Sequence, residues 1–282
     1  MSSSVNPSMR VPHGAFALLR DLVHERTGLY FEDAKSDMFL GKLSPLVVER
    51  GFASLLDYYY FLKYDPGSAD GWRKLFVALT VQESFFWREM DQVRALVDEI
   101  VPHYFMAHPD QTLNIWSAAC AAGEEPLTIA MALHEAGWFD RARINIYASD
   151  ASPRAVEAAR NGVYRERSFR SLPPGLREKY FVCADGGLWQ ASSELHSRVH
   201  WRTANIMSEA DIALAAIASP VVFCRNVLIY FSESATRKTV RVFAERMPRP
   251  GYLFVGAAES LLKITSDFEL REIGDAFVYI RN

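Results

Sequence analysis

A loop of small residues followed by two acids is the first segment of the sequence that could bind a ligand. It runs from Ser117 through Ala122 to Gly123 and leads directly into Glu124 and Glu125. Small residues let a backbone approach a ligand closely, and a helix that begins here offers free N–H groups and the positive end of its dipole. The segment therefore suits a carboxylate or a nucleotide moiety. Alternatively, the two acids only stabilise the first turn of a helix, and the segment alone leaves both interpretations open.

Two further groups of polar residues follow apolar runs that are typical of strands. Asp150 ends the first run, where a carboxylate can hydrogen-bond the hydroxyls of a ribose. It could equally cap the helix that is predicted to begin near Pro153. Arg225 and Asn226 follow the second run, and Tyr230 lies just beyond them. Their structural alternatives are an ion pair, a turn residue and a core aromatic.

A third candidate segment, residues 80–89, places Gln82, Ser84 and Arg88 around three adjacent aromatic residues. An arginine can pair with the carboxylate of a ligand or a substrate through charge-assisted hydrogen bonds. The structural alternative is a hinge between domains that is packed by its aromatic residues, with the stem of Arg88 lying along apolar surface.

The sequence argues against several other kinds of site. Cys120, Cys183 and Cys224 are widely spaced and form no C-x-x-C pair, so we expect neither a disulfide framework nor a metal centre. The loop at 117–125 contains one glycine instead of a G-x-G-x-x-G fingerprint. Its acidic pair would also repel a pyrophosphate, which counts against a nicotinamide-dependent oxidoreductase.

The composition is that of a globular protein with no general affinity for nucleic acid or membranes. Half of the 282 residues are hydrophobic, 23% are charged, and the formal net charge is only -3, with no long run of one sign. No apolar stretch approaches the roughly 20 residues that span a bilayer, and the first residues lack the apolar core of a signal peptide. We therefore expect a cytoplasmic monomer that neither binds nucleic acid nor inserts into membranes.

Two kinds of secondary structure must position the candidate residues. Residues 13–80 have apolar side chains at helical spacing, with Ser54 as a predicted N-cap and Asp65-Pro66-Gly67 as a stop. Beyond residue 93, short apolar runs alternate with amphipathic segments, which indicates a mostly parallel, doubly wound α/β sheet. The predicted strands are 113–118, 144–149, 221–224, 252–256 and 276–280, and the predicted helices are 124–136, 153–160 and 233–246.

Ligands of such sheets bind at the carboxyl ends of the strands, at a switch in the strand order. The loop at 117–125, Asp150 and Arg225 each follow a predicted strand, so we expect them to meet at one edge of the sheet. The alternation breaks at 172–201, where turn signals predict a small inserted β element.

These segments, in this order, resemble the CheR family of chemotaxis-receptor methyltransferases. The resemblance covers the chain from Thr80 to its C-terminus and, more weakly, the helical part through Thr27-Gly28-Leu29. Its most specific motif is Phe-Cys-Arg-Asn-Val-Leu-Ile-Tyr-Phe at 223–231. The other motifs are 116–126, 148–150, 159–164, 179–181 and 251–256 with Glu259.

The resemblance implies an all-α N-terminal domain followed by a Rossmann-like class I methyltransferase sheet with a small inserted β subdomain. The expected domains are a flexible tail at 1–12, a helical domain at 13–80, a linker at 81–92 that contributes to the site, and an S-adenosylmethionine-binding domain at 93–282 with the β insertion at about 180–202. The implied activity is protein-glutamate O-methylation of a methyl-accepting chemotaxis-type receptor. S-adenosylmethionine would be the methyl donor, S-adenosylhomocysteine the product, and no metal would take part.

The resemblance also implies a role for each candidate residue. Arg88, Tyr230 and Arg225 are the expected catalytic residues. The expected cofactor-binding residues are Gln82, Ser84, Arg88, Ala118, Glu125, Asp150, Asn205, Ile206, Arg225 and Asn226. The family usually has asparagine and threonine where Gln82 and Ser84 stand, and Ser-Thr where Ala121-Ala122 stand. These departures motivate an alternative function, an S-adenosylmethionine-binding regulatory module of a chemosensory pathway with weak or no catalytic activity.

Overall fold

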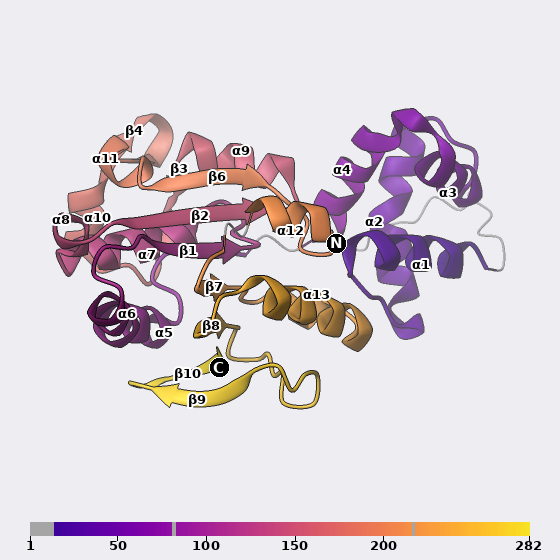
Figure 1. The fold of residues 1–282 in the computed structure, drawn as a ribbon. Helices are drawn as coiled ribbons and strands as arrows, with labels where there is room; N and C mark the ends of the chain where they lie inside the picture. Colours follow the sequence, from indigo (N-terminus) through magenta and orange to yellow (C-terminus); the bar gives the residue numbers. More distant parts are fainter. Residues whose placement is uncertain (1–13, 81–82, 216–217) are drawn as a thin grey trace. The chain divides into compact units, whose positions relative to one another are not determined.

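The computed structural model describes residues 14–80, 83–215 and 218–282, and the chain divides into two compact units (Figure 1). The helical unit holds the described residues up to Thr80 together with the short segment Tyr230–Ser232. The sheet unit holds the remainder, within Gln82–Ile229 and Glu233–Asn282. The predicted tail at 1–12 and the start of the predicted linker at 81–92 lie outside the described residues.

The helical unit is built from amphipathic helices whose ends carry local stop and start signals. Ser54 accepts a hydrogen bond from the backbone N–H of Asp57 at 3.1 Å, as its predicted N-cap role requires. Gly28 ends the first helix in a left-handed conformation with φ 77°. Leu19, Phe39 and other apolar side chains from each helix form one core. The helices are α1 (Ala15–Thr27), α2 (Ser36–Glu49), α3 (Leu55–Tyr64) and α4 (Ala69–Leu79), with 3-10 turns at Asp33–Lys35 and Pro66–Ser68.

The segment Tyr230–Ser232 completes the helical unit although it is distant in sequence. The backbone N–H of Tyr30 donates to the carbonyl of Tyr230 at 2.9 Å, and Leu29 forms an antiparallel bridge with Phe231. The imidazole of His24 lies 2.7 Å from the hydroxyl of Ser232. The predicted catalytic residue Tyr230 therefore packs as part of the helical unit.

The sheet unit is organised around a seven-stranded mixed sheet with the order β6-β2-β1-β7-β8-β10-β9. The first five strands in this order are parallel to one another. Strand β10 runs antiparallel to both of its neighbours, β8 and β9. The predicted α/β sheet with parallel central strands is thus confirmed. The strands are β1 (Leu113–Ala118), β2 (Ile144–Asp150), β6 (Val199–Thr203), β7 (Val221–Phe223), β8 (Gly251–Phe254), β9 (Glu269–Ile273) and β10 (Ala276–Arg281).

Helices cover both faces of this sheet. On one face α13 packs its Phe243 ring edge-on against Trp116 of β1, with ring centroids 5.5 Å apart, and α12 contacts β2. Figure 1 shows α12 and α13 on the near side of the strands. Helices α7 and α9 contact β2 and β6 from the other face. The helices are α5 (Met90–Arg94), α6 (Val101–Ala107), α7 (Glu124–Glu135), α8 (Trp138–Arg141), α9 (Pro153–Asn161), α10 (Pro174–Tyr180), α11 (Ser193–His196), α12 (Glu209–Ala215) and α13 (Glu233–Arg246), with a π-helical stretch at Ala95–Ile100.

A second, three-stranded sheet has the order β3-β5-β4, with β3 (Val163–Arg165), β4 (Phe181–Ala184) and β5 (Leu188–Ala191). The predicted boundaries of the insertion, about 180–202, are corrected by this arrangement. The small sheet already begins at Val163, and Val199–Thr203 pairs with β2 as an edge strand of the main sheet. Its sequence hides this role because an edge strand buries few side chains, and only Val199 of β6 is buried.

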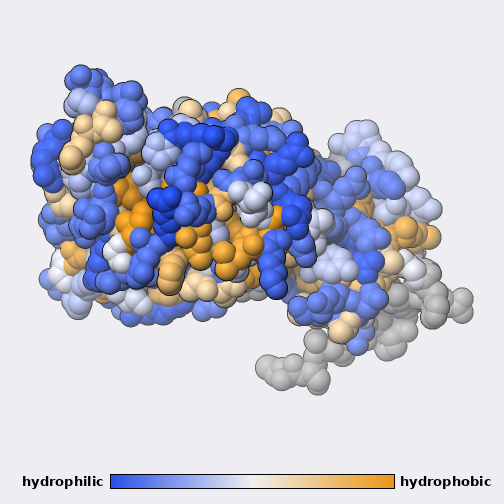
Figure 2. Space-filling model, turned by 60° about the horizontal axis from the view of Figure 1, so that its bottom comes forward, coloured by the Kyte–Doolittle hydropathy of each residue, from blue (hydrophilic) through white to orange (hydrophobic). Residues whose placement is uncertain are grey.

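The surface and core of the sheet unit are clearly separated. In the face shown in Figure 2, hydrophilic residues predominate and hydrophobic atoms are visible mainly in a central band. The central strands are almost completely buried, and every residue of β7 and β8 belongs to the interior. Among the described residues, no helix combines the length and apolar character needed to cross a membrane.

Candidate functional site

The loop after β1 turns sharply at the carboxyl edge of the sheet. Ala119, Ala121 and Gly123 have positive φ values of 63°, 49° and 96°. The backbone N–H of Cys120 donates to the carbonyl of Ser149 at 2.9 Å, which ties the loop to the end of β2. A Cβ on Gly123 would lie only 2.7 Å from the indole of Trp201, so only glycine fits at this position. The loop therefore presents backbone and methyl groups instead of long side chains.

Asp150 joins the loops that follow β1 and β2. Its Oδ2 accepts from the backbone N–H of Ala121 at 3.0 Å, and its Oδ1 accepts from that of Ser152 at 2.8 Å. Burial raises the pKa of Asp150, while these two hydrogen bonds oppose the rise. Ser152, whose hydroxyl accepts from the N–H of Ala155 at 3.3 Å, is the N-cap of α9. The alternative in which Asp150 only caps this helix is therefore wrong.

Glu125 and Arg225, both predicted to bind a cofactor, bind each other. Arg225 Nε lies 2.8 Å from Glu125 Oε2, and the hydroxyl of Ser117 donates to Glu125 Oε1 at 2.6 Å. The side chain of Arg225 is only 3% exposed and that of Glu125 only 14%. Burial raises the pKa of Glu125, and the guanidinium of Arg225 opposes the rise.

Arg225 also holds the backbone of the segment that leads into α5. Its Nη2 donates to the carbonyl of Arg88 at 2.9 Å. Its Nη1 donates to Gln92 Oε1 at 3.2 Å and to the carbonyl of Glu89 at 3.4 Å. Both Nη nitrogens of this guanidinium thus donate to protein oxygens, while its Nε, which makes no hydrogen bond among the described residues, lies at ion-pair distance from Glu125; the arrangement suits a residue that positions its neighbours.

Glu124 anchors the same segment from the first turn of α7. It is only 4% exposed, and burial raises its pKa. The hydroxyl of Ser168 donates to Glu124 Oε1 at 3.1 Å, and the hydroxyl of Ser84 also hydrogen-bonds this carboxyl group. The backbone N–H of Trp87 donates to Thr128 Oγ1 at 3.1 Å. Ser84, a predicted cofactor residue, thus has a partner inside the protein.

The partly buried acid Glu259 organises the loop after β7. Glu259 Oε2 accepts from the backbone N–H groups of Asn226 at 2.8 Å and Gly256 at 2.6 Å, and its Oε1 accepts from that of Ile229 at 3.1 Å. Asn226 has a positive φ of 59°. A Cβ on Gly256 would lie only 2.3 Å from the side-chain amide Nδ2 of Asn226. The sequence motif contained Glu259, but its structural role was not predicted.

The remaining predicted residues lie in different surroundings. The side chain of Arg88 is 31% exposed, and its Nη1 donates to the carbonyl of Glu83 at 3.3 Å. Asn205 follows β6, and its Oδ1 accepts from the N–H of Met207 at 2.9 Å. Ile206 and Ala118 are buried. The remaining predicted ligand residue, Gln82, lies outside the described part of the chain.

Two residues with contacts in this site, Glu89 and Gln92, were missed from the sequence. Gln92 is buried, and its Nε2 donates to the carbonyl of Val255 at 2.8 Å while its Oε1 accepts from Arg225. Both residues lie near the start of a helix, where polar residues are common, so nothing in the local pattern marked them.

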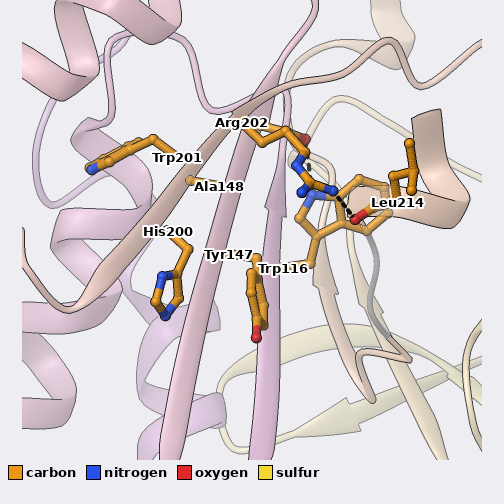
Figure 3. Close-up of a pocket in the computed structure, with 8 residues that line it drawn as sticks. Trp116, Tyr147, Ala148, His200, Trp201, Arg202 and Leu214 are labelled. Carbon is orange, nitrogen blue, oxygen red and sulfur yellow. Dashed lines mark hydrogen bonds between the residues drawn. The ribbon is translucent and has the colours of Figure 1, made fainter.

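A separate cleft of about 270 Å³ lies on the face of the sheet that carries α12 (Figure 3). The rings of Tyr147 and His200 stack along it with centroids 5.1 Å apart, and Trp116 Nε1 donates to Ser149 Oγ at 3.0 Å. Figure 3 shows Tyr147 and His200 pointing to one side of the strands and Trp201 to the other. The described lining of this cleft contains none of the predicted site residues.

Comparison with known proteins gives consistent matches over both units. Residues 82–277 match the family described as CheR methyltransferase, SAM binding domain, and residues 14–80 match the CheR methyltransferase all-alpha domain. Chemotaxis protein methyltransferase 2 of Vibrio cholerae is 30% identical, with 94% of this chain and 92% of the relative covered. Chemotaxis protein methyltransferase 1 of Pseudomonas aeruginosa is 29% identical, with coverages of 96% and 99%. A solved magnesium protoporphyrin IX methyltransferase from Synechocystis with bound SAM is 16% identical, with 80% and 93% covered and a TM-score of only 0.33.

Proposed function

The chain belongs to the CheR methyltransferase family, and on that premise we propose that it methylates glutamate side chains of a methyl-accepting chemotaxis-type receptor. Family membership makes it an S-adenosylmethionine-dependent methyltransferase of the chemotaxis type. The glutamate acceptor and the receptor are the proposed parts. They are supported by the names of the relatives and by the absence of any need for a general base when the acceptor is a glutamate carboxylate.

The observation that carries the proposal is the meeting of Asp150 with the loop after β1. The hydrogen bond from Ala121 N–H to Asp150 Oδ2, at 3.0 Å, brings a carboxylate against a turn of small residues at the carboxyl edge of a parallel sheet. A carboxylate oxygen can accept more than one hydrogen bond, so Asp150 can still accept from ribose hydroxyls. The donor set therefore fits a nucleoside such as S-adenosylmethionine, with Asp150 on the ribose and the loop at 119–123 against the amino-acid end.

The reaction requires the protein to align the methyl donor and the carboxylate more than to transfer a proton. S-adenosylmethionine would supply a methyl group on a cationic sulfur: a carboxylate oxygen would bond to the methyl carbon as the carbon–sulfur bond breaks, and S-adenosylhomocysteine would leave as the neutral thioether. A glutamate side chain has an ordinary pKa of about 4.3, so it is already ionised at neutral pH and needs no general base. Holding two reactants in line can supply on the order of 7–11 kcal/mol of the barrier reduction.

Two residues are proposed for this alignment. Arg88 is the more accessible guanidinium of the site, since its side chain is 31% exposed whereas that of Arg225 is 3% exposed. We assign it the carboxylate of the cofactor or the substrate, because an arginine pairs with carboxylates through two parallel donors. Tyr230 is proposed to orient the acceptor oxygen or the methyl group, with its ring facing the positive sulfur.

The proposal is tested by transfer of a radiolabelled methyl group to the cytoplasmic helical fragment of a receptor. We expect a label that is released by mild base, since a glutamate methyl ester hydrolyses and a methylated amine does not. Asp150→Asn places an amide N–H₂ among two backbone donors, so it should weaken S-adenosylhomocysteine binding at least tenfold, the scale of losing one or two charged hydrogen bonds. A base-stable label would exclude the glutamate ester, and tight cofactor binding without transfer would favour a regulatory module.

A further inference from the structure

The segment before α5 is held in an unusual backbone conformation on both sides of Arg88. Trp87 has φ 68° and Glu89 has φ 51°, which are left-handed values that residues with side chains seldom adopt. Such conformations persist when the surrounding structure determines them, and they concentrate at functional sites. Here the N–H of Trp87 is fixed by Thr128, and the carbonyl of Arg88 is fixed by Arg225. The turn that presents Arg88 is therefore imposed by the sheet unit.

Glu89 is the last residue of this turn and faces three candidate site residues. Its Oε1 lies 3.6 Å from Arg88 Nε and 3.4 Å from the amide Nδ2 of Asn226. Its Oε2 lies 3.8 Å from Arg225 Nε. The carboxylate is 20% exposed, and its Oε2 is buried without a hydrogen-bond donor among the described residues. Glu89 therefore acts on its neighbours and does not present Oε2 to the solvent.

The charges of the cluster separate the roles of the two acids. Glu125 already binds Arg225 closely, at 2.8 Å. Glu89 is the acid that forms an ion pair with Arg88 within the described chain, while the Nη1 of Arg88 is directed to the carbonyl of Glu83. Without Glu89 the guanidinium of Arg88 would keep a neutral partner but lose the charge that attracts it. Glu89 is thus the charged neighbour of the Arg88 guanidinium, which also lies 5.4 Å from the ring centroid of Phe85.

We propose that Glu89 is a positioning residue, whose carboxylate orients Arg88 and Asn226 at the cofactor edge of the site. The inference rests on the proposed role of Arg88 as a ligand clamp. It assigns no contact between Glu89 and the ligand, because the two acidic oxygens face Arg88, Arg225 and Asn226 from inside the protein. Its effect on binding must therefore pass through these neighbours.

The test is a double-mutant cycle on S-adenosylhomocysteine affinity, measured by calorimetry with the full chain. Glu89→Gln keeps the shape of the side chain and an acceptor for Asn226, but it removes the charge beside Arg88. We expect it to weaken binding about tenfold, with little change in the melting temperature. In an Arg88→Ala background the same change should weaken binding less than about twofold, because the residue that it orients is absent.

Glu83→Gln is the matched control, since Glu83 is in the same segment but 71% exposed and paired with Arg170 at 3.4 Å. It should leave the affinity within about twofold of the parent. An equal loss from Glu89→Gln in both backgrounds, or no loss in the parent, would overturn the proposal. Because the measurement needs no methyl acceptor, failure of receptor methylation would refute the proposed substrate and leave this result unaffected.

Discussion

Replacing Arg225 by methionine would remove a buried guanidinium that links several parts of the sheet unit. The side chain is 3% exposed, pairs with Glu125 at 2.8 Å and donates to the carbonyl of Arg88 at 2.9 Å. Methionine keeps much of the volume but leaves Glu125 buried without its counter-charge. Breaking a buried pair on one side costs about 3–5 kcal/mol, and we expect a loss of that size in the free energy of unfolding.

The loss should depend on pH. Burial already raises the pKa of Glu125, so this group contributes stability below its unfolded-state pKa, which is lost as the pH rises through the folded-state pKa. Arg225 lowers the pKa of Glu125, so its removal raises that pKa further. The destabilisation that Arg225→Met causes, measured by urea unfolding, should therefore be smaller at about pH 5 than at about pH 8.

A matched control separates the effect of burial on stability from the effect of the ion pair itself. Arg241 Nε lies 2.8 Å from Glu245 Oε1, the same separation, but the two side chains are 74% and 54% exposed. Arg241→Met should cost only about 0.3–0.5 kcal/mol. Adding Glu125→Gln to Arg225→Met should recover part of the loss, because it removes the unpaired buried charge. The reasoning would be refuted if the two arginine variants lost equal stability, or if the double variant were no more stable than Arg225→Met.

Two further predictions concern the loop after β1. Gly123→Ala should destabilise the protein by about 2 kcal/mol or more, because φ is 96° and a Cβ would lie 2.7 Å from Trp201; an unchanged melting temperature would contradict this. Glu124→Gln should raise the free energy of unfolding at about pH 8 and change it little at about pH 5, because burial raises the pKa of Glu124 and one of its oxygens has no donor among the described residues. Urea unfolding at both pH values measures this difference. A gain of the same size at both pH values would disprove the explanation.

Local signals in the sequence predicted most of the main sheet and its helices. The strand at 113–118 and the helix at 233–246 have the predicted bounds, since each combines a clear hydrophobic pattern with polar or turn residues at its ends. Strands β6 and β9 were not predicted. Both are edge strands with mostly exposed residues, and β9, Glu-Leu-Arg-Glu-Ile, has three charged side chains. Such strands are specified by the neighbour they pair with, which a single segment does not reveal.

The site was predictable in its location and much less so in its contacts. The rule that parallel strands present their carboxyl ends at one edge correctly brought Asp150 and the loop at 119–123 together. The pairing of Arg225 with Glu125 depends on the register of β1 beside β7, in which Ser117 lies next to Phe223. Glu89 makes its contacts from a left-handed backbone conformation. Neither feature is encoded by a pattern within one segment.

The sequence by itself determined the family, the α/β architecture and the location of Asp150, Glu125 and Arg225 at the carboxyl edge of the sheet, because these follow from ordered motifs and from hydrophobic periodicity along the chain. Only the tertiary structure decided what each charged group faces. It placed Arg225 against Glu125, Ser84 and Ser168 on Glu124, and Glu89 beside Arg88. The physical reason is that the partners of a side chain, and the pKa that burial gives it, depend on groups brought close by packing between distant segments.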